Sequence, residues 1–355
     1  MRKKEGVWLV VGSFLTPIIN YPLQEVVLEK NSKQIIIGEV VNPVNGYKSI
    51  GIDIDNLFEH ILVIGSTGSG KTYTVSRIIT RAYETNGINA IVFDWHGEYY
   101  RLLRKYNYYT PYDLPVNVFS SDKYLSLEVL SDVLELTPPQ TYVLERILRE
   151  HSIETLYELV NVLENSIDES SWMRESRYAL LRKLYPLIRE KYLRIFGGKD
   201  KDLGVRKNGI NVIDLSVISD NSIRRVYASL VLKHLFLEAV STKSPLNTLV
   251  VLEEAQNYVS RESPLRLIRS MLAEVRKFRI GLIIVSQSPS LLAEDVMVNT
   301  NTKIIHSMKS HRDLEVVSKI LYSPEEIQRV IPYLGVGEAI LYTRNLKKPI
   351  IIKIT

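Results

Sequence analysis

From Ile61 onward, short apolar runs alternate with longer amphipathic stretches, a pattern typical of strands that are each followed by a helix. Regular alternation of this kind predicts a parallel sheet with helices packed on its faces. The first helix is predicted over Lys71–Glu84. The strands are predicted at Ile61–Ile64, Ala90–Asp94, Val116–Phe119, Ile210–Leu215, Thr248–Glu253, Gly281–Ser286, Lys303–His306 and Ala339–Thr343.

Two stretches depart from this alternation. In residues 1–50, short apolar runs are separated by Gly, Pro and Asn, which predicts a short N-terminal β segment. Residues 121–208 have a helical pattern and would interrupt a core of residues 51–355. The helices of this insertion are predicted after the N-cap Thr137, over Ile153–Leu163 after Ser152, and over Ser171–Phe196 with a kink at Pro186. The predicted fold class is therefore α/β.

Composition is that of a soluble globular protein, with 355 residues, 45% hydrophobic and 24% charged. The chain has no cysteine, which excludes disulfides, thiolate metal sites and a cysteine nucleophile. Glutamine is scarce while Lys and Glu are abundant, a bias that fits a thermophile. The net charge of +5 permits nucleic-acid binding without requiring it.

Basic residues are concentrated in the last helix predicted in the insertion. This stretch includes Arg174, Arg177, Arg182, Lys183, Arg189, Lys191 and Arg194. Glu175 and Glu190 lie among them, so two interpretations remain open: a solvated helix face, or a surface that contacts nucleic acid.

The first residues resemble a secretion signal, because Arg2, Lys3 and Lys4 precede the apolar run Val7–Leu15. No small-x-small cleavage site follows, and Pro17 ends the run, which favours a buried strand. No apolar stretch approaches the roughly 20 residues of a membrane span. The sequence therefore predicts a cytoplasmic protein.

Glycine, lysine and threonine follow the strand Ile61–Ile64 in the spacing G-x-x-x-x-G-K-[ST], the phosphate-binding loop (P-loop). The glycines let backbone N–H groups turn toward a phosphate, and the next helix adds its positive dipole end. Lys71 is expected to contact the β- and γ-phosphates, and Thr72 to hold Mg²⁺. A glycine-rich turn is the simpler alternative, but all features agree and predict binding of ATP with Mg²⁺. The nucleotide-binding residues are predicted to be Gly65, Ser66, Thr67, Gly68, Ser69, Gly70, Lys71, Thr72 and Tyr73.

Two carboxylates end the apolar strand at Thr248–Glu253, a pattern typical of the Walker B motif. Glu253 is expected near Mg²⁺, through a water molecule, and Glu254 is expected to polarise the attacking water. A charged strand end is common by itself, but the P-loop upstream favours the catalytic interpretation.

Gln287 follows the buried strand Gly281–Ser286, at the strand end where ligands of parallel sheets bind. It is therefore expected to sense the γ-phosphate or its water, although a loop amide that is satisfied locally is the alternative. Arg276 and Arg279 precede the same strand and are candidates to offset transition-state charge from a neighbouring subunit, although each alone is more often a surface arginine.

Taken together, the sequence resembles the HerA branch of the HerA/FtsK superfamily, archaeal DNA translocases and helicases. The resemblance covers about residues 55–355. The matching segments are His60–Thr72, Asp94–Tyr99, Asn211–Ser216, Glu253–Gln256, Arg276-Lys277 before Gly281, Ser286–Pro289, Gly337–Ile340 and Pro349–Lys353. The His96-Gly97-Glu98-Tyr99 part separates this branch from other P-loop ATPases.

The resemblance implies a RecA-like core that assembles as a hexameric ring around double-stranded DNA, with ATP between subunits. It implies that Lys71, Thr72, Glu253, Glu254 and Gln287 act in their own subunit and that Arg276 acts on the neighbour's ATP. It also implies a partnership with a NurA-type nuclease in DNA end processing.

The chain differs from the usual family pattern at several positions. Glu59 stands where the family usually has Arg, Gln256 where it has His, and Ser288 where it has Arg. Typical members also have an N-terminal barrel longer than residues 1–50 provide, so the resemblance is to a HerA-type ATPase with a shortened N-terminal barrel region. Two other hypotheses remain open: a secretion- or conjugation-type ATPase acting on a protein or membrane-associated partner, and an ATP-binding scaffold that does not hydrolyse.

Overall fold

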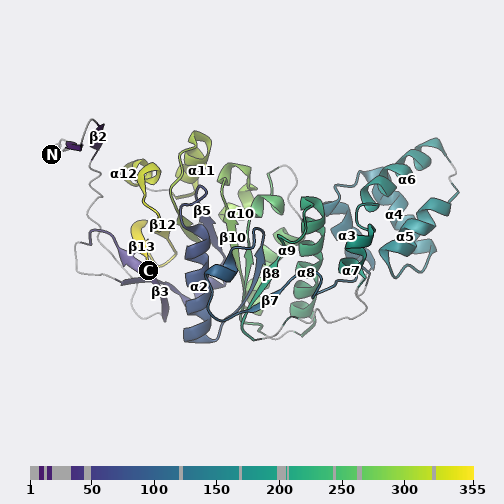
Figure 1. Ribbon diagram of the computed structural model, residues 1–355, viewed down its shortest axis with the longest axis horizontal. Helices are drawn as coiled ribbons and strands as arrows, with labels where there is room; N and C mark the ends of the chain where they lie inside the picture. The colour runs from purple at the N-terminus through teal and green to yellow at the C-terminus, as the bar shows by residue number, and fades with distance from the viewer. Residues whose placement is uncertain are drawn as a thin grey trace.

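The computed structural model describes residues 8–11, 14–17, 33–43, 49–119, 123–167, 170–197, 205, 208–242, 245–261, 266–321 and 325–355. A sheet covered by helices forms the middle of the molecule, and a group of helices forms one end (Figure 1). At the other end β1 (Trp8–Val11) and β2 (Phe14–Pro17) pair as an antiparallel hairpin. Arg2, Lys3 and Lys4 lie outside the described residues.

Within the described ranges, the main sheet has 11 strands in the order β4-β3-β13-β12-β11-β5-β10-β9-β6-β8-β7. From β11 to β7 neighbouring strands are parallel, whereas β12, β13, β3 and β4 join by antiparallel pairing. The predicted α/β class with a mainly parallel sheet is therefore confirmed. The strand bounds are β3 Gln34–Val40, β4 Ser49–Asp53, β5 Ile61–Ile64, β6 Asn89–Asp94, β7 Asn107–Tyr109, β8 Ile210–Asp214, β9 Thr248–Leu252, β10 Ile280–Ser286, β11 Thr302–Ile305, β12 Glu338–Tyr342 and β13 Ile350–Ile354.

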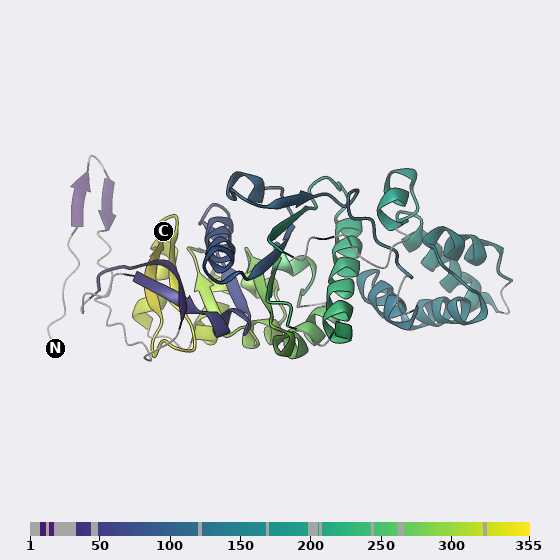
Figure 2. The same ribbon diagram turned by 90° about the horizontal axis from the view of Figure 1, so that it is seen from below.

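Helices cover both faces of this sheet. The helix bounds are α1 Ile54–Leu57, α2 Lys71–Asn86, α3 Lys123–Val133, α4 Pro138–Glu150, α5 Leu156–Asn165, α6 Ser171–Leu184, α7 Glu190–Phe196, α8 Asn221–Thr242, α9 Arg266–Glu274, α10 Glu294–Val298, α11 His311–Leu321 and α12 Glu325–Val330. In both views α8 lies between the sheet and the insertion helices (Figures 1 and 2). It packs against α3, the first helix of the insertion.

Alternate residues of each central strand face two different hydrophobic cores. In β5, Ile61 and Val63 pack in the core that contains α2, whereas Leu62 and Ile64 pack in the core that contains α8. Because successive strand side chains point to opposite faces, a strand buried on both faces must be apolar throughout. This explains why the parallel strands appear in the sequence as continuous apolar runs.

The insertion differs in detail from its predicted helices. The helix predicted over Ile153–Leu163 is α5, which begins at Leu156 after the N-cap Thr155, later than predicted, because the Thr155 hydroxyl accepts a hydrogen bond from the Glu158 N–H at 3.1 Å. The predicted Ser171–Phe196 helix is two helices, α6 and α7, and Pro186 lies in the break between them. Proline lacks the N–H that a continuous helix needs, so a break replaces the predicted kink.

The predicted strand Val116–Phe119 is wrong. These residues form a buried loop in which Asn117 makes an isolated bridge to Gly197 and the Val116 N–H donates to the Ile195 carbonyl at 2.8 Å. Their apolar side chains pack against the insertion. The strand that precedes the insertion is instead β7, which pairs in parallel with β8.

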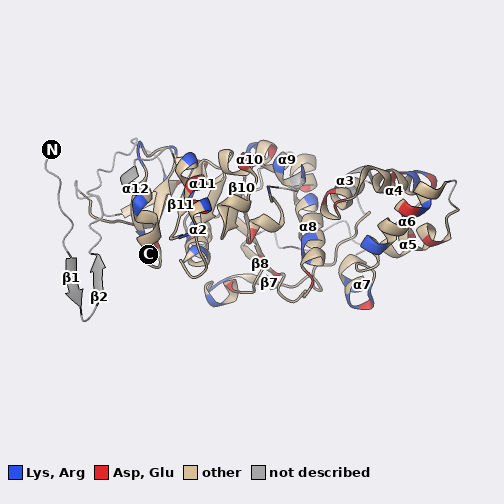
Figure 3. Ribbon diagram, turned by 90° about the horizontal axis from the view of Figure 1, so that it is seen from above, with Lys and Arg blue, Asp and Glu red and all other residues tan. Residues whose placement is uncertain are grey.

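Basic residues of the insertion have mixed environments. Acidic and basic positions are interleaved on α4 and α6, whereas the charged positions of α5 are acidic (Figure 3). Arg177 is buried and donates to the Leu163 carbonyl at 2.7 Å, and Lys183 donates to the Glu135 carbonyl at 2.7 Å. These two cations therefore support the helix packing, whereas Arg174 and Arg182 are exposed.

The division into residues 1–50, 51–355 and an insertion at 121–208 stays a prediction, and the main sheet continues across residue 50 through β3 and β4.

Candidate active site

The P-loop lies between β5 and α2, at the carboxyl end of the central strand. Gly65, Gly68 and Gly70 have φ of 155°, 76° and 106°, values that residues with a Cβ rarely adopt. A Cβ on Gly65 would lie 2.5 Å from the His306 Cβ, and one on Gly70 would lie 3.0 Å from the Gly337 backbone nitrogen. Backbone conformation and close packing therefore both require glycine at these two positions.

Residues far along the chain hold the loop in place. The backbone N–H and the side-chain hydroxyl of Ser66 both donate to the Ser307 carbonyl at 2.8 Å. The Gly337 N–H donates to the Ser69 carbonyl at 3.1 Å. The buried Ser69 hydroxyl has no hydrogen-bond partner within the described parts of the chain, so a polar group inside the loop remains available to a ligand.

His306 supports the loop from behind. Its Nδ1 lies 2.9 Å from the Glu338 carbonyl oxygen, and its Nε2 lies 2.9 Å from the Thr74 hydroxyl. Because a carbonyl only accepts, Nδ1 bears the proton, and Nε2 shares the hydrogen of the Thr74 hydroxyl with the Gly70 carbonyl, which lies 3.0 Å from that hydroxyl. Burial lowers the pKa of His306 to about 4, so the imidazole is neutral at pH 7.

Lys71 and Thr72 begin α2 next to the loop. The Lys71 ammonium donates to the Ser66 carbonyl at 3.0 Å, and its burial lowers its pKa. The Thr72 hydroxyl donates to a carboxylate oxygen of Glu98 at 3.3 Å. Tyr73 is 40% exposed beside them. The arrangement presents an ammonium, a hydroxyl and backbone donors at a helix N-terminus, a combination suited to phosphate groups.

Glu253 is buried at the end of β9. The Tyr99 hydroxyl donates to its Oε1 at 2.6 Å. Burial raises the pKa of Glu253 to about 7, against the opposing effect of the Tyr99 hydrogen bond. A cation beside this carboxyl would favour its ionised form.

Glu254 is the next residue and has a different environment. Its φ of 49° and ψ of 50° place it in the left-handed region, which is uncommon for a residue other than glycine and is typical of functional sites. Its carboxylate accepts hydrogen bonds from the side-chain amides of Gln287 and Gln256, and His96 Nε2 lies 3.2 Å from its Oε1.

Gln287 connects this carboxylate to the P-loop. Its amide nitrogen contacts Glu254, while its amide oxygen accepts a hydrogen bond from the Thr67 hydroxyl at 2.5 Å. The Gln287 side chain therefore links Glu254, beyond the end of β9, with the P-loop, beyond the end of β5. Glu254, Gln287 and the P-loop, which were predicted separately from the sequence, lie together in the structure.

His96 and Glu98 were not predicted as site residues, although their segment supported the family resemblance. Asp94 organises this segment, because its carboxylate accepts from the N–H groups of Gly97 at 2.9 Å and Tyr99 at 3.0 Å. The turn so formed places His96 against Glu254 and Glu98 against Thr72. A polar segment directly after a buried strand was the signal in the sequence.

Arg276 is not near the P-loop of its own chain. It precedes β10, at the amino end of the parallel strands, and forms an ion pair with Glu59. Arg279 is held at the same edge by Asn247 at 2.6 Å and Asp55 at 3.5 Å, and its guanidinium lies over the Phe58 ring. The structure separates these arginines from Lys71 and Glu254.

Within the described residues, no group of three or more His, Asp or Glu side chains could hold a metal ion alone. The Thr72 hydroxyl contacts Glu98, and the carboxylates of Glu98 and Glu253 both act electrostatically on Lys71, so the P-loop is surrounded by hydroxyl and carboxylate oxygens of the kind that Mg²⁺ prefers. These residues fit an ion that takes its remaining ligands from phosphate and water.

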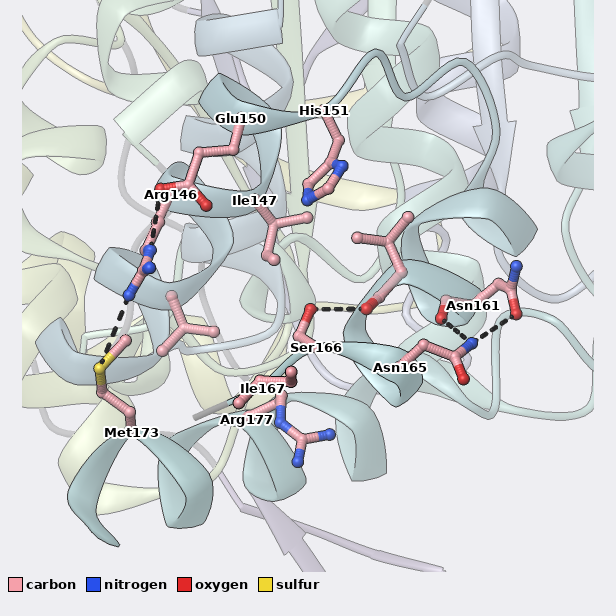
Figure 4. Close-up of a pocket in the computed structure, with 12 residues that line it drawn as sticks. Arg146, Ile147, Glu150, His151, Asn161, Asn165, Ser166, Ile167, Met173 and Arg177 are labelled. Atoms are coloured by element: carbon pink, nitrogen blue, oxygen red, sulfur yellow. Dashed lines mark hydrogen bonds and ion pairs between the residues drawn. The ribbon is translucent and has the colours of Figure 1, made fainter. Parts of the chain in front are cut away.

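A separate cavity of about 460 Å³ lies in the insertion, among α4, α5 and α6 (Figure 4). Its lining includes Arg146, Ile147, His151, Asn165, Met173 and Arg177. It shares no lining residue with the P-loop site.

In the described part of the chain, no helix is long and apolar enough to cross a membrane.

Fold and site together define a P-loop NTPase with a RecA-like α/β core. The chain belongs to the HerA helicase family, because the family model described as "Helicase HerA, central domain" matches residues 35–235. The predicted resemblance is thereby confirmed.

Curated relatives agree with this membership. The DNA double-strand break repair helicase HerA of Sulfurisphaera tokodaii is 27% identical over 86% of this chain and 66% of that protein. The DNA import protein CedB of Sulfolobus acidocaldarius is 26% identical over 83% of this chain and 52% of that protein. The chain thus spans about two thirds of the length of its HerA relatives and half that of CedB.

Solved structures support the fold. VirB4 of Thermoanaerobacter pseudethanolicus superposes with a TM-score of 0.70 at 18% identity, over 93% of this chain and 98% of that chain. The plasmid coupling protein TrwB, in complex with ADP and Mg²⁺, has a TM-score of 0.65 at 14% identity, over 93% and 96%. At these identities the similarity concerns the fold alone.

Proposed function

We propose that this chain binds ATP with Mg²⁺ and hydrolyses it to move along double-stranded DNA as a subunit of a hexameric ring. The observation that supports this most is the chain of contacts from the P-loop through Gln287 to Glu254. Such a connection lets the state of the nucleotide change the position of residues after β9 and β10. Relatives whose names describe DNA helicases make DNA the expected track.

Nucleotide binding is assigned to residues 65–73. In this assignment Lys71 exchanges its contact with the Ser66 carbonyl for the β- and γ-phosphates, and the backbone N–H groups of the loop bind phosphate oxygens. Thr72, Glu98 and Glu253 would hold Mg²⁺, directly or through water. When bound, this ion neutralises charge on the phosphates.

Glu254 is assigned as the residue that polarises the attacking water. Its carboxylate is already oriented by two side-chain amides and by His96. Gln287 is assigned as the sensor, because any movement of Thr67 with the phosphates is passed to Glu254 through one amide. Arg276 is assigned to the nucleotide of a neighbouring subunit, in agreement with its distance from its own site.

DNA contact is assigned to backbone phosphates rather than base edges, because the sequence contains no base-reading motif. Affinity should then fall steeply with salt. A NurA-type nuclease partner, a role in DNA end processing and a cytoplasmic location belong to the same proposal.

A second candidate is a role in DNA transfer between cells. The similarity to the DNA import protein CedB favours it, at an identity close to that of the HerA relatives. The same motor chemistry would then act with a membrane-associated partner. A scaffold that does not hydrolyse is disfavoured, because Lys71, Glu254 and Gln287 are all present. Lys71 and Gln287 both contact residues of the P-loop, and Gln287 also contacts Glu254.

The proposal is tested by ATP hydrolysis of the wild type and of Glu254→Gln, with and without linear duplex DNA, across a salt series. DNA should stimulate the wild type, the stimulation should fade as salt rises, and the variant should lose at least about 100-fold in kcat. Wild-type hydrolysis that ignores DNA at every salt concentration would contradict the DNA motor. Stimulation by a membrane or protein partner instead would favour the second candidate.

A further inference from the structure

A buried carboxylate holds two exposed arginines at the amino end of the parallel strands. The side chain of Glu59 is 4% exposed, whereas those of Arg276 and Arg344 are 57% and 65% exposed. Both guanidinium groups contact Oε1 of Glu59, Arg344 at 3.3 Å, and the Asn301 amide donates to Oε2 at 2.8 Å. Every oxygen of this carboxylate is therefore used, while both arginines keep most of their donors free of partners among the described residues.

These residues come from separate segments that meet at one edge. Glu59 precedes β5, Arg276 precedes β10, and Asn301 precedes β11. Arg344 follows β12, which is antiparallel to β11, so it lies at the same edge. The P-loop and Gln287 lie at the opposite edge, after β5 and β10. The seven residues of β10 separate the two edges by roughly 20 Å, farther than an arginine side chain extends.

The charges in this cluster do not cancel. One carboxylate faces two guanidinium groups, so the group bears a net positive charge at an exposed edge. Two arginines this close would repel each other without Glu59 between them. Glu59 thus fixes two forked donors side by side, an arrangement that matches the oxygens of a phosphate group.

We propose that Glu59 positions Arg276 and Arg344 together as a binding site for the terminal phosphate of a nucleotide held by a second copy of this chain. This inference rests on the proposed function and adds to it a second arginine and the residue that orients both. An anion site at one edge and a P-loop at the other let copies associate head to tail, each completing the next site. Arg344 is then a catalytic residue in trans, and Glu59 is a positioning residue.

The first experiment compares hydrolysis by the wild type, Arg344→Ala and Glu59→Gln, with Lys277→Ala as the control. Lys277 is an exposed cation next to Arg276 that pairs with Glu274 rather than Glu59. Arg344→Ala should lower kcat by at least about tenfold with KM changed less than about threefold. Glu59→Gln keeps the shape but removes the charge that aligns the arginines, and should lower kcat about threefold or more. Lys277→Ala should match the wild type.

The second experiment asks whether Arg344 acts on the neighbouring copy. Arg344→Ala and Glu254→Gln chains, each defective alone, are produced together and purified as mixed assemblies. Where a Glu254→Gln chain offers its intact Arg344 to the intact site of an Arg344→Ala chain, hydrolysis should return. A purely structural role for Arg344 predicts no such recovery.

The outcomes separate this inference from the proposed function. Recovery in the mixed assemblies supports the site. The site is overturned if Arg344→Ala hydrolyses ATP as fast as the wild type, or if the mixed assemblies do not recover the hydrolysis that Arg344→Ala lost. Either result leaves the proposed function intact. A wild type without hydrolysis, alone or with DNA, contradicts the proposed function and the site together.

Discussion

At the scale of single residues, Glu253 and Glu254 show how environment separates two identical side chains. Glu253 is enclosed, accepts a hydrogen bond from Tyr99 and has a raised pKa. Glu254 adopts a left-handed backbone conformation and faces the side-chain donors of Gln256, Gln287 and His96. Such a difference assigns different roles to neighbouring carboxylates.

Glu253 makes stability depend on pH. Its folded-state pKa of about 7 lies above the ordinary value of 4.5, so the folded chain retains a proton that the unfolded chain loses. The contribution of this carboxyl is fully present below pH 4.5 and is lost as the pH rises to 7. The loss amounts to roughly 3 kcal/mol.

Thermal unfolding between pH 4.5 and 8 measures this effect. Glu253→Gln should gain stability relative to the wild type as the pH rises, because the amide cannot ionise. The exposed Glu84→Gln is the matched control for removal of one negative charge. Parallel curves for the wild type and Glu253→Gln would show that Glu253 does not titrate in this range.

Local motifs made most of the site predictable, whereas contacts between distant segments did not. The P-loop, Glu254 and Gln287 follow strands whose carboxyl ends share an edge, so their meeting follows from the fold class. The ion pairs that Glu59 forms with Arg276 and Arg344 join residues more than 200 positions apart. They depend on the order of strands in the sheet, and no local sequence pattern specifies that order. Sequence alone therefore presented Glu59 only as a departure from the family.

At the scale of elements, buried parallel strands were predictable and irregular apolar segments were not. Ile61–Ile64 matches β5 without error, since a strand buried on both faces is apolar throughout. Val116–Phe119 has the same composition but buries its side chains from a loop, and composition cannot separate the two. β7 was missed because Asn107–Tyr109 is short and only partly buried.

The start of α5 offers a direct test of helix capping in the insertion. Thr155 accepts from the Glu158 N–H, and the Glu158 carboxylate accepts from the Glu154 N–H at 2.8 Å. Thr155→Ala should lower the free energy of unfolding by about 1 kcal/mol, whereas Thr155→Ser should retain most of it. Urea unfolding distinguishes them, and equal losses in both variants would argue against the cap.

At the scale of the whole molecule, the sheet unites segments that the sequence presents separately. Among the strands that the structure describes, β3 and β4 join the parallel strands through β13 and β12, which come from the other end of the chain. The same arrangement places Gly337 against the P-loop and Arg344 against Glu59. The C-terminal strands therefore contact both the nucleotide edge and the opposite edge of the sheet.

Movement along duplex DNA is the central claim, and displacement of a third strand from linear duplex DNA tests it most directly. With ATP, the wild type should release a triplex-forming oligonucleotide, and Glu254→Gln should release none at equal DNA binding. Release should also fall as salt weakens the phosphate contacts. DNA-stimulated hydrolysis by the wild type without any release would contradict the account.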